Sequence, residues 1–417
     1  NPVSMYPLIA IAFALALLVL LLRSKIRVGR AMVLTTLFIT VLLWVSPLQT
    51  WRGLLSEWKN QPLGETTGYL FVSIAGLLYL VNVLGEAMQI TGVSERLVPA
   101  LHGLFRSRRM ALAAIPMLMG LLPTPGGIML SAPMVRHSGD RIGVDRAHQA
   151  AINYFFRHQW ESVWPLFPAI PLIQGLLGIS IGRLVAHNIF LCVIGLAAGV
   201  LFLLTYGIPP RNPEHTAPSC GWHENLRHFI HAFWPIALAA LLAIMLNIPA
   251  GLGLLTALII FLLLHRVPVK NCGQIFKKAF EADFVLLILA ALFFKLNLEV
   301  AGAIPQIVDF LTGLHVPPPV LVFLLPFLVS FVTGMTTPSI IITFPLLAGF
   351  IGSGPACHVG LQTLAFTGIL CALACSPIHL CLALSCSYFE APFGRILLRL
   401  IGPVMVLFAT GVVSAFF

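Results

Sequence analysis

Charged side chains are scarce in this sequence. Asp, Glu, Lys and Arg make up 9% of the 417 residues, whereas they make up about 25% of an ordinary soluble domain. So few charges cannot cover the surface of a soluble protein of this length, which excludes a soluble enzyme and a disordered protein. The hydrophobic content of 59% instead predicts an all-α polytopic membrane protein.

Several chemical motifs are also missing. No GxxxxGK[ST] motif is present, which argues against ATP-driven transport, and no HExxH motif or Asp pair within a span indicates an intramembrane enzyme. The eight cysteines form no CxxC and most lie in apolar stretches, where a thiol behaves as a small hydrophobe. We therefore predict a non-enzyme without disulfides, cofactors or a metal centre, apart from a coupling ion.

The net charge of +10 is not spread as a nucleic-acid surface would be. Basic residues gather in short clusters between apolar spans, a pattern that indicates membrane topology. We therefore expect no nucleic-acid partner, and the lipid bilayer as the surrounding medium.

The apolar spans predict ten membrane crossings and two re-entrant hairpins. With the hairpins at 110–135 and 319–351 returning to their own side, nineteen basic residues lie in inside loops and three in outside loops. This bias predicts that both termini lie outside and that 208–230 is a cytoplasmic linker. The crossings are 5–22, 31–47, 68–90, 147–168, 184–207, 231–248, 250–265, 280–302, 360–389 and 394–417.

Similar landmarks recur about 210 residues apart, which predicts an internal repeat. Residues 90–101 resemble 300–311, and Pro125 and Pro165 correspond to Pro338 and Pro377. Each half, 1–207 and 231–417, holds five crossings and one hairpin. Five is odd, so the halves are predicted to be inverted, which is the usual design of a secondary transporter.

Both hairpins contain helix breakers at the predicted membrane depth. A broken backbone there is tolerated where it lines a polar cavity, and its free N–H groups favour an anion. A proline kink in an ordinary crossing is the alternative interpretation. The predicted binding residues at the two tips are Pro123, Thr124, Pro125, Gly126 and Gly127 in the first hairpin and Thr336, Thr337, Pro338 and Ser339 in the second.

Two further prolines interrupt the spans that follow the hairpins. Trp164 and Pro165 lie in the predicted broken helix 147–168, and Ser376 and Pro377 in the predicted broken helix 360–389. The carbonyl groups freed at such interruptions can coordinate a cation. Simple kinks are the alternative.

The segment before Pro165 carries ionisable residues inside an apolar span. Asn153, Arg157 and Glu161 are spaced to share one helix face. Either Arg157 and Glu161 neutralise each other, or Arg157 attracts a substrate carboxylate while Glu161 or His158 carries protons. His379 follows the second break, and its two interpretations are a structural hydrogen-bond donor and a proton carrier.

The order of hairpin, interrupted helix and second hairpin resembles the ion-transporter superfamily. This group includes gluconate permeases, C4-dicarboxylate carriers, divalent-anion/sodium symporters and the membrane subunit of tripartite periplasmic carriers. LLPTPGGIMLSAPMV, NYFFRHQWESVWPLFP and SPIHLCLALSCSYF most resemble a prokaryotic membrane family catalogued as domain of unknown function 401.

The resemblance implies an elevator-type carrier in the prokaryotic cytoplasmic (inner) membrane, usually a homodimer. The hairpins and interrupted helices would then move against the other helices. In sodium/dicarboxylate relatives each tip carries Ser-Asn-Thr. The Asn is absent from both tips here, and Pro-Thr-Pro-Gly looks more like the gluconate permeases.

These patterns together predict a secondary active transporter of a small organic anion, a carboxylate, coupled to a cation. Na⁺ is favoured over H⁺ because the hydroxyls of Thr124, Thr337 and Ser376 lie at or near repeat-matched positions. The alternatives are an anion channel, and the membrane subunit of a tripartite carrier that needs a periplasmic binding protein.

Overall fold

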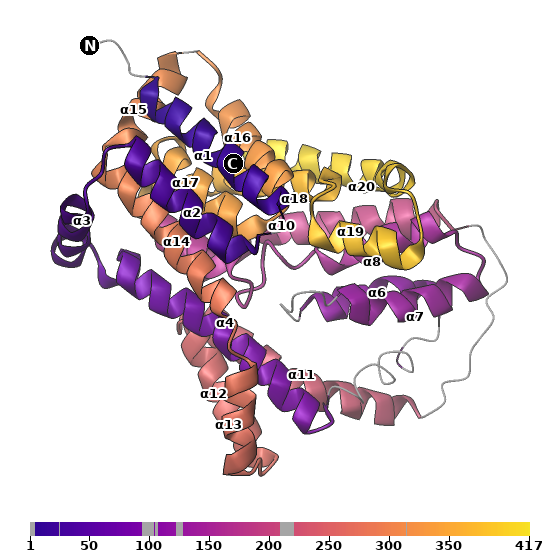
Figure 1. Ribbon diagram of the computed structural model, residues 1–417. Coiled ribbons are helices and arrows are strands. Elements are labelled where there is room, and N and C mark those ends of the chain that lie inside the picture. The colour runs from indigo at the N-terminus through magenta and orange to yellow at the C-terminus, as the bar shows by residue number, and fades with distance from the viewer. Residues whose placement is uncertain are drawn as a thin grey trace.

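The protein is built from helices, as the computed structural model shows for residues 5–24, 26–93, 104, 107–121, 128–208, 221–313 and 315–417 (Figure 1). Within these ranges there is no β-strand. The helices up to the predicted linker are α1 (Tyr6–Arg23), α2 (Val28–Leu42), α3 (Pro47–Asn60), α4 (Thr67–Ile90), α6 (Arg108–Gly120), α7 (Ile128–Arg141), α8 (Arg146–Arg157), α9 (Ala169–Leu177) and α10 (Ile181–Gly199), which continues as a π-helical turn to Thr205. The later helices are α11 (Trp222–Met245), α12 (Ala250–Leu264), α13 (Val269–Lys278), α14 (Ala282–Val300), α15 (Ala303–Gly313), α16 (Pro318–Thr333), α17 (Thr336–Ile351), α18 (Val359–Cys375), α19 (Leu380–Phe389) and α20 (Phe393–Ser414).

Many of these helices are long and apolar enough to cross a bilayer. In the described ranges six helical segments meet this test, or eight if two bent helix pairs each count as one span. The first bent pair is α2 and α3, where the chain bends by 104°, and the second is α14 and α15, where it bends by 74°. The prediction of an all-α, multi-pass membrane protein is thus confirmed, while the number of ten crossings stays a prediction.

Two predicted features of the first half differ from the structure. The span 147–168 is wrong in its second part, because α8 ends at Arg157 and helix resumes only at Ala169. Pro165 and Pro168 explain the gap, since a proline has no N–H to donate and clashes with the preceding turn. The span 31–47 ends early at Leu42, and the chain turns into the amphipathic α3, which Ser46 and Gln49 cap reciprocally.

The helix pairs α6–α7 and α16–α17 occupy the two predicted hairpins, and the helices of each pair pack against each other. The tip of the first hairpin, 122–127, lies outside the described residues. The second hairpin is described throughout and turns between α16 and α17 at Gly334, whose φ of 68° suits a residue without Cβ.

Three apolar cores hold the helices together. One joins α1, α2, α14, α9 and the second hairpin with α18. Another joins α4 with α6, α11, α12 and α13, and the third joins α7, α8, α10, α19 and α20. The second piece of each interrupted helix therefore packs against the hairpin of the other half. In the first half α9 packs against α17 of the second hairpin, and in the second half α19 packs against α7 of the first hairpin and against α8 (Figure 1).

The polar side chains of Lys295, Asn297 and Glu299 in α14 are paired, which offsets the cost of burying them in an apolar medium. Lys295 and Glu299, four residues apart in α14, form an ion pair with 3.2 Å between Nζ and Oε1. Asn297, which lies between them in sequence, donates to the hydroxyl of Thr40 and accepts from that of Thr50, and so links α14 to α2 and α3.

Candidate functional site

The first interruption exposes the end of α8 and the start of α9. Residues 158–168 contain turns without a continuous helix. Arg157, the last residue of α8, donates a hydrogen bond of 2.8 Å from Nη1 to the carbonyl of Met119 in the first hairpin. Trp160 donates from Nε1 to the carbonyl of Met117 at 2.9 Å. The first hairpin is thereby attached to the first interruption.

The second interruption is shorter and is attached to the second hairpin. It spans 376–379, between α18 and α19. Ser376 donates from Oγ to the carbonyl of Phe331 at 2.7 Å, and His379 Nδ1 lies 2.8 Å from the carbonyl of Gly334. Each interruption therefore makes hydrogen bonds to the hairpin that precedes it in the sequence.

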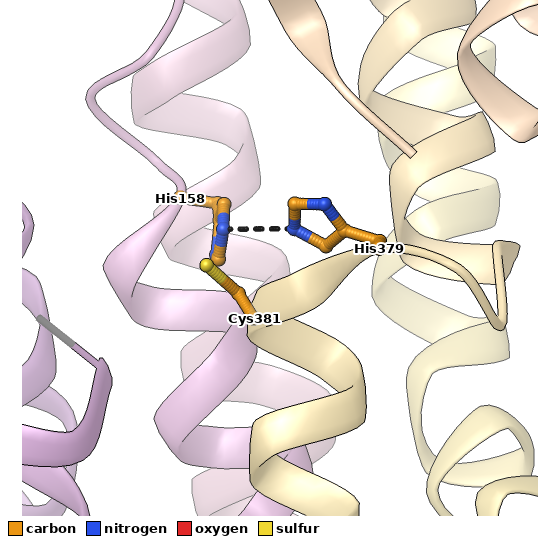
Figure 2. Close-up of side chains that lie close together, drawn as sticks. All are labelled: His158, His379 and Cys381. Atoms are coloured by element: carbon orange, nitrogen blue, oxygen red, sulfur yellow. Dashed lines mark hydrogen bonds between the residues drawn. The ribbon is translucent and has the colours of Figure 1, made fainter. Parts of the chain in front are cut away.

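The two interruptions meet each other. The Nε2 atoms of His158 and His379 lie 3.3 Å apart, although 221 residues separate them in sequence (Figure 2). Glu161, also in the first interruption, has Oε1 3.7 Å from His158 Nε2 and accepts a 3.2 Å hydrogen bond at Oε2 from Thr336 of the second hairpin. His158, Glu161 and His379 are all buried.

A cavity of about 270 Å³ opens at this meeting point. One wall comes from the interruptions and the second hairpin, and the other from apolar residues of α2, α4 and α14 together with Asn82. The wall formed by the interruptions, the hairpin and the adjoining helix ends consists of Arg157, His158, Glu161, Phe167, Pro168, Ala169, Gly334, Met335, Thr336, Thr337, Pro338, Ile378, His379, Leu380 and Cys381.

Helix ends give this wall its electrostatic character. The helices α9, α17 and α19 all begin at the cavity, at Ala169, Thr336 and Leu380, and none has a side-chain cap on its first N–H groups. Uncapped helix N-termini carry partial positive charge and donate to anions. The C-terminal end of α8 and that of α16 reach the same cavity at His158 and Gly334, and such ends favour cations.

The predicted site residues divide into three groups. Those that line the cavity are Arg157, His158, Glu161, Thr336, Thr337, Pro338 and His379. Those that are described but do not line it are Asn153, Trp164, Pro165, Ser339, Ser376 and Pro377. Those that lie outside the described residues are Pro123, Thr124, Pro125, Gly126 and Gly127.

Several residues of the second group have structural contacts instead. Ser339 Oγ donates to the carbonyl of Met335 at 2.6 Å and so stabilises the first turn of α17. Asn153 accepts a 2.6 Å hydrogen bond from Ser131, which joins α8 to α7. The Trp164 ring stacks on Phe233 of α11.

The prediction that Asn153, Arg157 and Glu161 share one helix face is wrong for Glu161. Because α8 ends at Arg157, Glu161 lies beyond the helix and turns towards His158 and Thr336. Residue spacing predicts a common face only as far as the helix continues.

Among the cavity residues that sequence reasoning missed, two have a polar or metal-ligating side chain, Asn82 and Cys381. Asn82 is a polar residue in the middle of the apolar α4, a signal that was available from the sequence. Cys381 has a side chain that is usual in an apolar span, so its place in the site follows only from the packing of α19 against α8.

Comparison with solved structures shows a fold in common with the YdaH transporter of Alcanivorax borkumensis, whose crystal structure revealed an unusual topology. The match covers 92% of this chain and 98% of that chain, with a TM-score of 0.63 and 13% sequence identity. At this identity the likeness shows the fold alone. No curated protein matches the sequence.

The sequence can be assigned to a family over nearly its whole length. A family model described as "Protein of unknown function (DUF401)" matches residues 9–416. The resemblance expected from the three motifs around the hairpins and interruptions is therefore confirmed: the chain belongs to the DUF401 family.

Proposed function

We propose that this protein is a secondary active transporter that moves a small organic anion, a carboxylate, together with a cation. The observation that carries the proposal is the cavity at which three uncapped helix N-termini and the Arg157 side chain meet a hairpin tip. A cavity of about 270 Å³ is slightly below the usual pocket range of about 300–1,000 Å³, so it suits a small substrate.

The anion would lie against the starts of α9, α17 and α19. Backbone N–H groups at helix N-termini bind carboxylates without a dedicated side chain. Arg157, with its guanidinium held by Met119, supplies a fixed positive charge on the same wall. The apolar wall from α4 and α14 would face the hydrocarbon part of the substrate.

Na⁺ is the coupling ion that we propose first. The carbonyl ends of α8 and α16 and the hydroxyl of Thr337 would be its oxygen ligands. The hydroxyl of Ser376 is engaged by Phe331 and does not line the cavity, so it would contribute only through rearrangement. Thr124, whose hydroxyl was also predicted to bind the cation, lies outside the described residues.

H⁺ is the second candidate, favoured by one specific observation. The three titratable residues predicted near the breaks, His158, Glu161 and His379, all line the cavity and lie beside one another. Such a cluster of carboxylate and imidazoles can take up and release protons within the substrate site.

An elevator mechanism agrees with this arrangement. The hairpins and interrupted helices hold on to one another, and they would form the moving part of a homodimeric carrier. The opposite wall, from α2, α4 and α14, would belong to the static part. The halves 1–207 and 231–417 would be the two inverted repeats, because each contains one hairpin followed by one interrupted helix.

Uptake into proteoliposomes tests the proposal. Vesicles with purified protein are supplied with radiolabelled small carboxylates under a Na⁺ gradient, a pH gradient or no gradient. Saturable accumulation above the external concentration, driven by one gradient, is expected. Ionic conductance without accumulation would identify an anion channel instead, and uptake only after addition of a soluble binding protein would identify a tripartite carrier.

A further inference from the structure

Three side chains with soft or borderline donor atoms meet where the two interrupted helices touch. His158 follows α8, His379 precedes α19, and Cys381 lies in the first turn of α19 (Figure 2). Their potential ligand atoms all lie within 4.8 Å of one another. This is the one such group of three or more His, Cys, Asp or Glu side chains in the described part of the chain.

Both imidazoles are oriented by backbone carbonyl groups. His158 Nδ1 lies 2.7 Å from the carbonyl of Tyr154, and His379 Nδ1 lies 2.8 Å from that of Gly334. A carbonyl oxygen only accepts, so each Nδ1 carries the proton and each neutral ring directs the lone pair of Nε2 outward. The tautomer and orientation of metal-ligating histidines are fixed in the same way.

The consequence is a close approach of two lone pairs. The two Nε2 atoms are 3.3 Å apart, and two neutral acceptors at that distance repel each other. A cation between or beside them removes the repulsion. Two nitrogen ligands about 2.0–2.1 Å from a tetrahedral Zn²⁺ lie roughly 3.4 Å apart, so the observed separation needs almost no adjustment.

We propose that His158, His379 and Cys381 bind a divalent metal ion of the zinc class at the junction of the two interrupted helices. Imidazole and thiolate donors select zinc-like ions over Na⁺ and Mg²⁺, which prefer oxygen. Cys381 Sγ must approach by at most about 1.3 Å, because the ligand atoms lie within 4.8 Å of one another and sulfur and nitrogen ligands of one tetrahedral zinc lie roughly 3.5 Å apart. Its partly exposed side chain leaves room for that movement.

Charge balance supports the same ion. On binding, the Cys381 thiol releases its proton to water and becomes a thiolate. The Glu161 carboxylate, with Oε1 3.7 Å from His158 Nε2, is a close counter-charge to the ion. One divalent ion, one thiolate and one carboxylate sum to zero, which limits the cost of burial. Arg157 is the remaining charged group that lines the cavity.

The sequence gives no sign of this site. The two histidines are 221 residues apart, whereas zinc motifs are recognised by short spacings between ligands. The prediction of no metal centre rested on the absence of a CxxC and on the apolar surroundings of most cysteines, and the proposed ion departs from it. Tyr154 contributes to the preorganisation of the site, because its ring packs on both imidazoles, with centroid distances of 4.3 Å to His158 and 5.6 Å to His379.

Cobalt(II) titration of the purified full-length protein in detergent, after chelator treatment, tests the proposal without any transport measurement. We expect one Co²⁺ per chain, the intense visible bands of a tetrahedral ion and the near-ultraviolet charge-transfer band that a thiolate ligand produces. Zn²⁺ should displace Co²⁺ and abolish these bands. Cys381→Ser should remove the charge-transfer band.

His158→Gln and His379→Gln should each weaken Co²⁺ binding by at least about tenfold, since even loss of an outer-shell partner costs about 10–100-fold. Size-exclusion chromatography and circular dichroism identify variants that fold. If a histidine variant does not fold, X-ray absorption of the zinc-loaded wild type identifies the ligand atoms of the metal directly. One sulfur and two imidazoles are expected in the first shell, and a shell of oxygen alone would overturn the proposal.

Two control variants isolate the site. Cys386→Ser removes another thiol of the same helix, α19, and should leave the spectrum unchanged. His231→Gln removes the imidazole pair of His231 and His265, whose Nε2 atoms lie 3.1 Å apart at the surface, and should leave the charge-transfer band in place. Persistence of that band in Cys381→Ser, or its loss in Cys386→Ser, would refute the assignment.

Discussion

The hydroxyl of Thr336 donates a hydrogen bond of 3.2 Å to the carboxylate of Glu161, across 175 residues of sequence. It joins the first turn of α17 in the second hairpin to the interruption that follows α8. With the contact between His158 and His379, it makes the hairpin tip and both interruptions one connected polar wall of the cavity.

Replacement of Thr336 by valine should weaken this wall. The carboxylate of Glu161 is buried, and loss of a hydrogen bond to a buried charged group costs about 1–3 kcal/mol. We expect Thr336→Val to lower the thermal unfolding temperature in detergent and to raise KM for uptake. Thr336→Ser keeps the donor and is the matched control. Equal behaviour of the two variants would show that the hydrogen bond has no role.

An alanine at Gly334 should be damaging for two separate reasons. The residue has a φ of 68°, and its added Cβ would lie 2.9 Å from the backbone of Ile378 and His379. Gly302→Ala is the control, because its φ is 61° with nothing within 4 Å of the new Cβ. Both variants carry the left-handed cost of about 1–2 kcal/mol. Gly334→Ala should lose about 1–3 kcal/mol more from overpacking, measured by thermal unfolding.

The first hairpin should be sensitive at Gly120. A Cβ there would clash with the carbonyl oxygen of Arg157, so Gly120→Ala must push α6 away from the end of α8. We expect a destabilisation of about 1–3 kcal/mol and slower uptake. The helical control is Gly76→Ala in α4, where nothing lies within 4 Å and alanine should stabilise by up to about 1 kcal/mol. If Gly120→Ala behaves like Gly76→Ala, α6 and α8 are not packed as described.

The predicted orientation can be tested by labelling single cysteines in intact cells. In a cysteine-free background, a membrane-impermeant maleimide should label Ser353→Cys, which is exposed between α17 and α18. In a second variant that keeps Cys220 of the predicted cytoplasmic linker as its only cysteine, the maleimide should label Cys220 only after the cells are opened. The positive-inside distribution of basic residues is the physical reason. Labelling of Cys220 from outside would reverse or refute the topology.

Zinc should inhibit uptake if the proposed metal site and the transport cavity coincide. A bound ion would occupy the wall at which the coupling cation and the substrate meet. Inhibition by micromolar-range Zn²⁺, reversed by a chelator, is expected for the wild type and Cys386→Ser and should be much weaker for Cys381→Ser. Equal inhibition of all three proteins would place the inhibitory zinc elsewhere.

The sequence by itself determined the class of this protein and the elements of its site. Scarcity of charge and long apolar runs fix a multi-pass helical protein, because each crossing must satisfy its own backbone hydrogen bonds. The prolines at 165 and 377 marked the two interrupted helices, since the effect of proline on a helix is local. The motifs around them were sufficient to identify the family.

Tertiary structure alone decided which side chains meet. The end of α8 at Arg157 moved Glu161 off the predicted helix face and towards Thr336. The packing of α19 on α8 brought His379 and Cys381 to His158. These contacts join residues more than 170 positions apart, and helical periodicity reports only which residues share one helix, not which helices pack together.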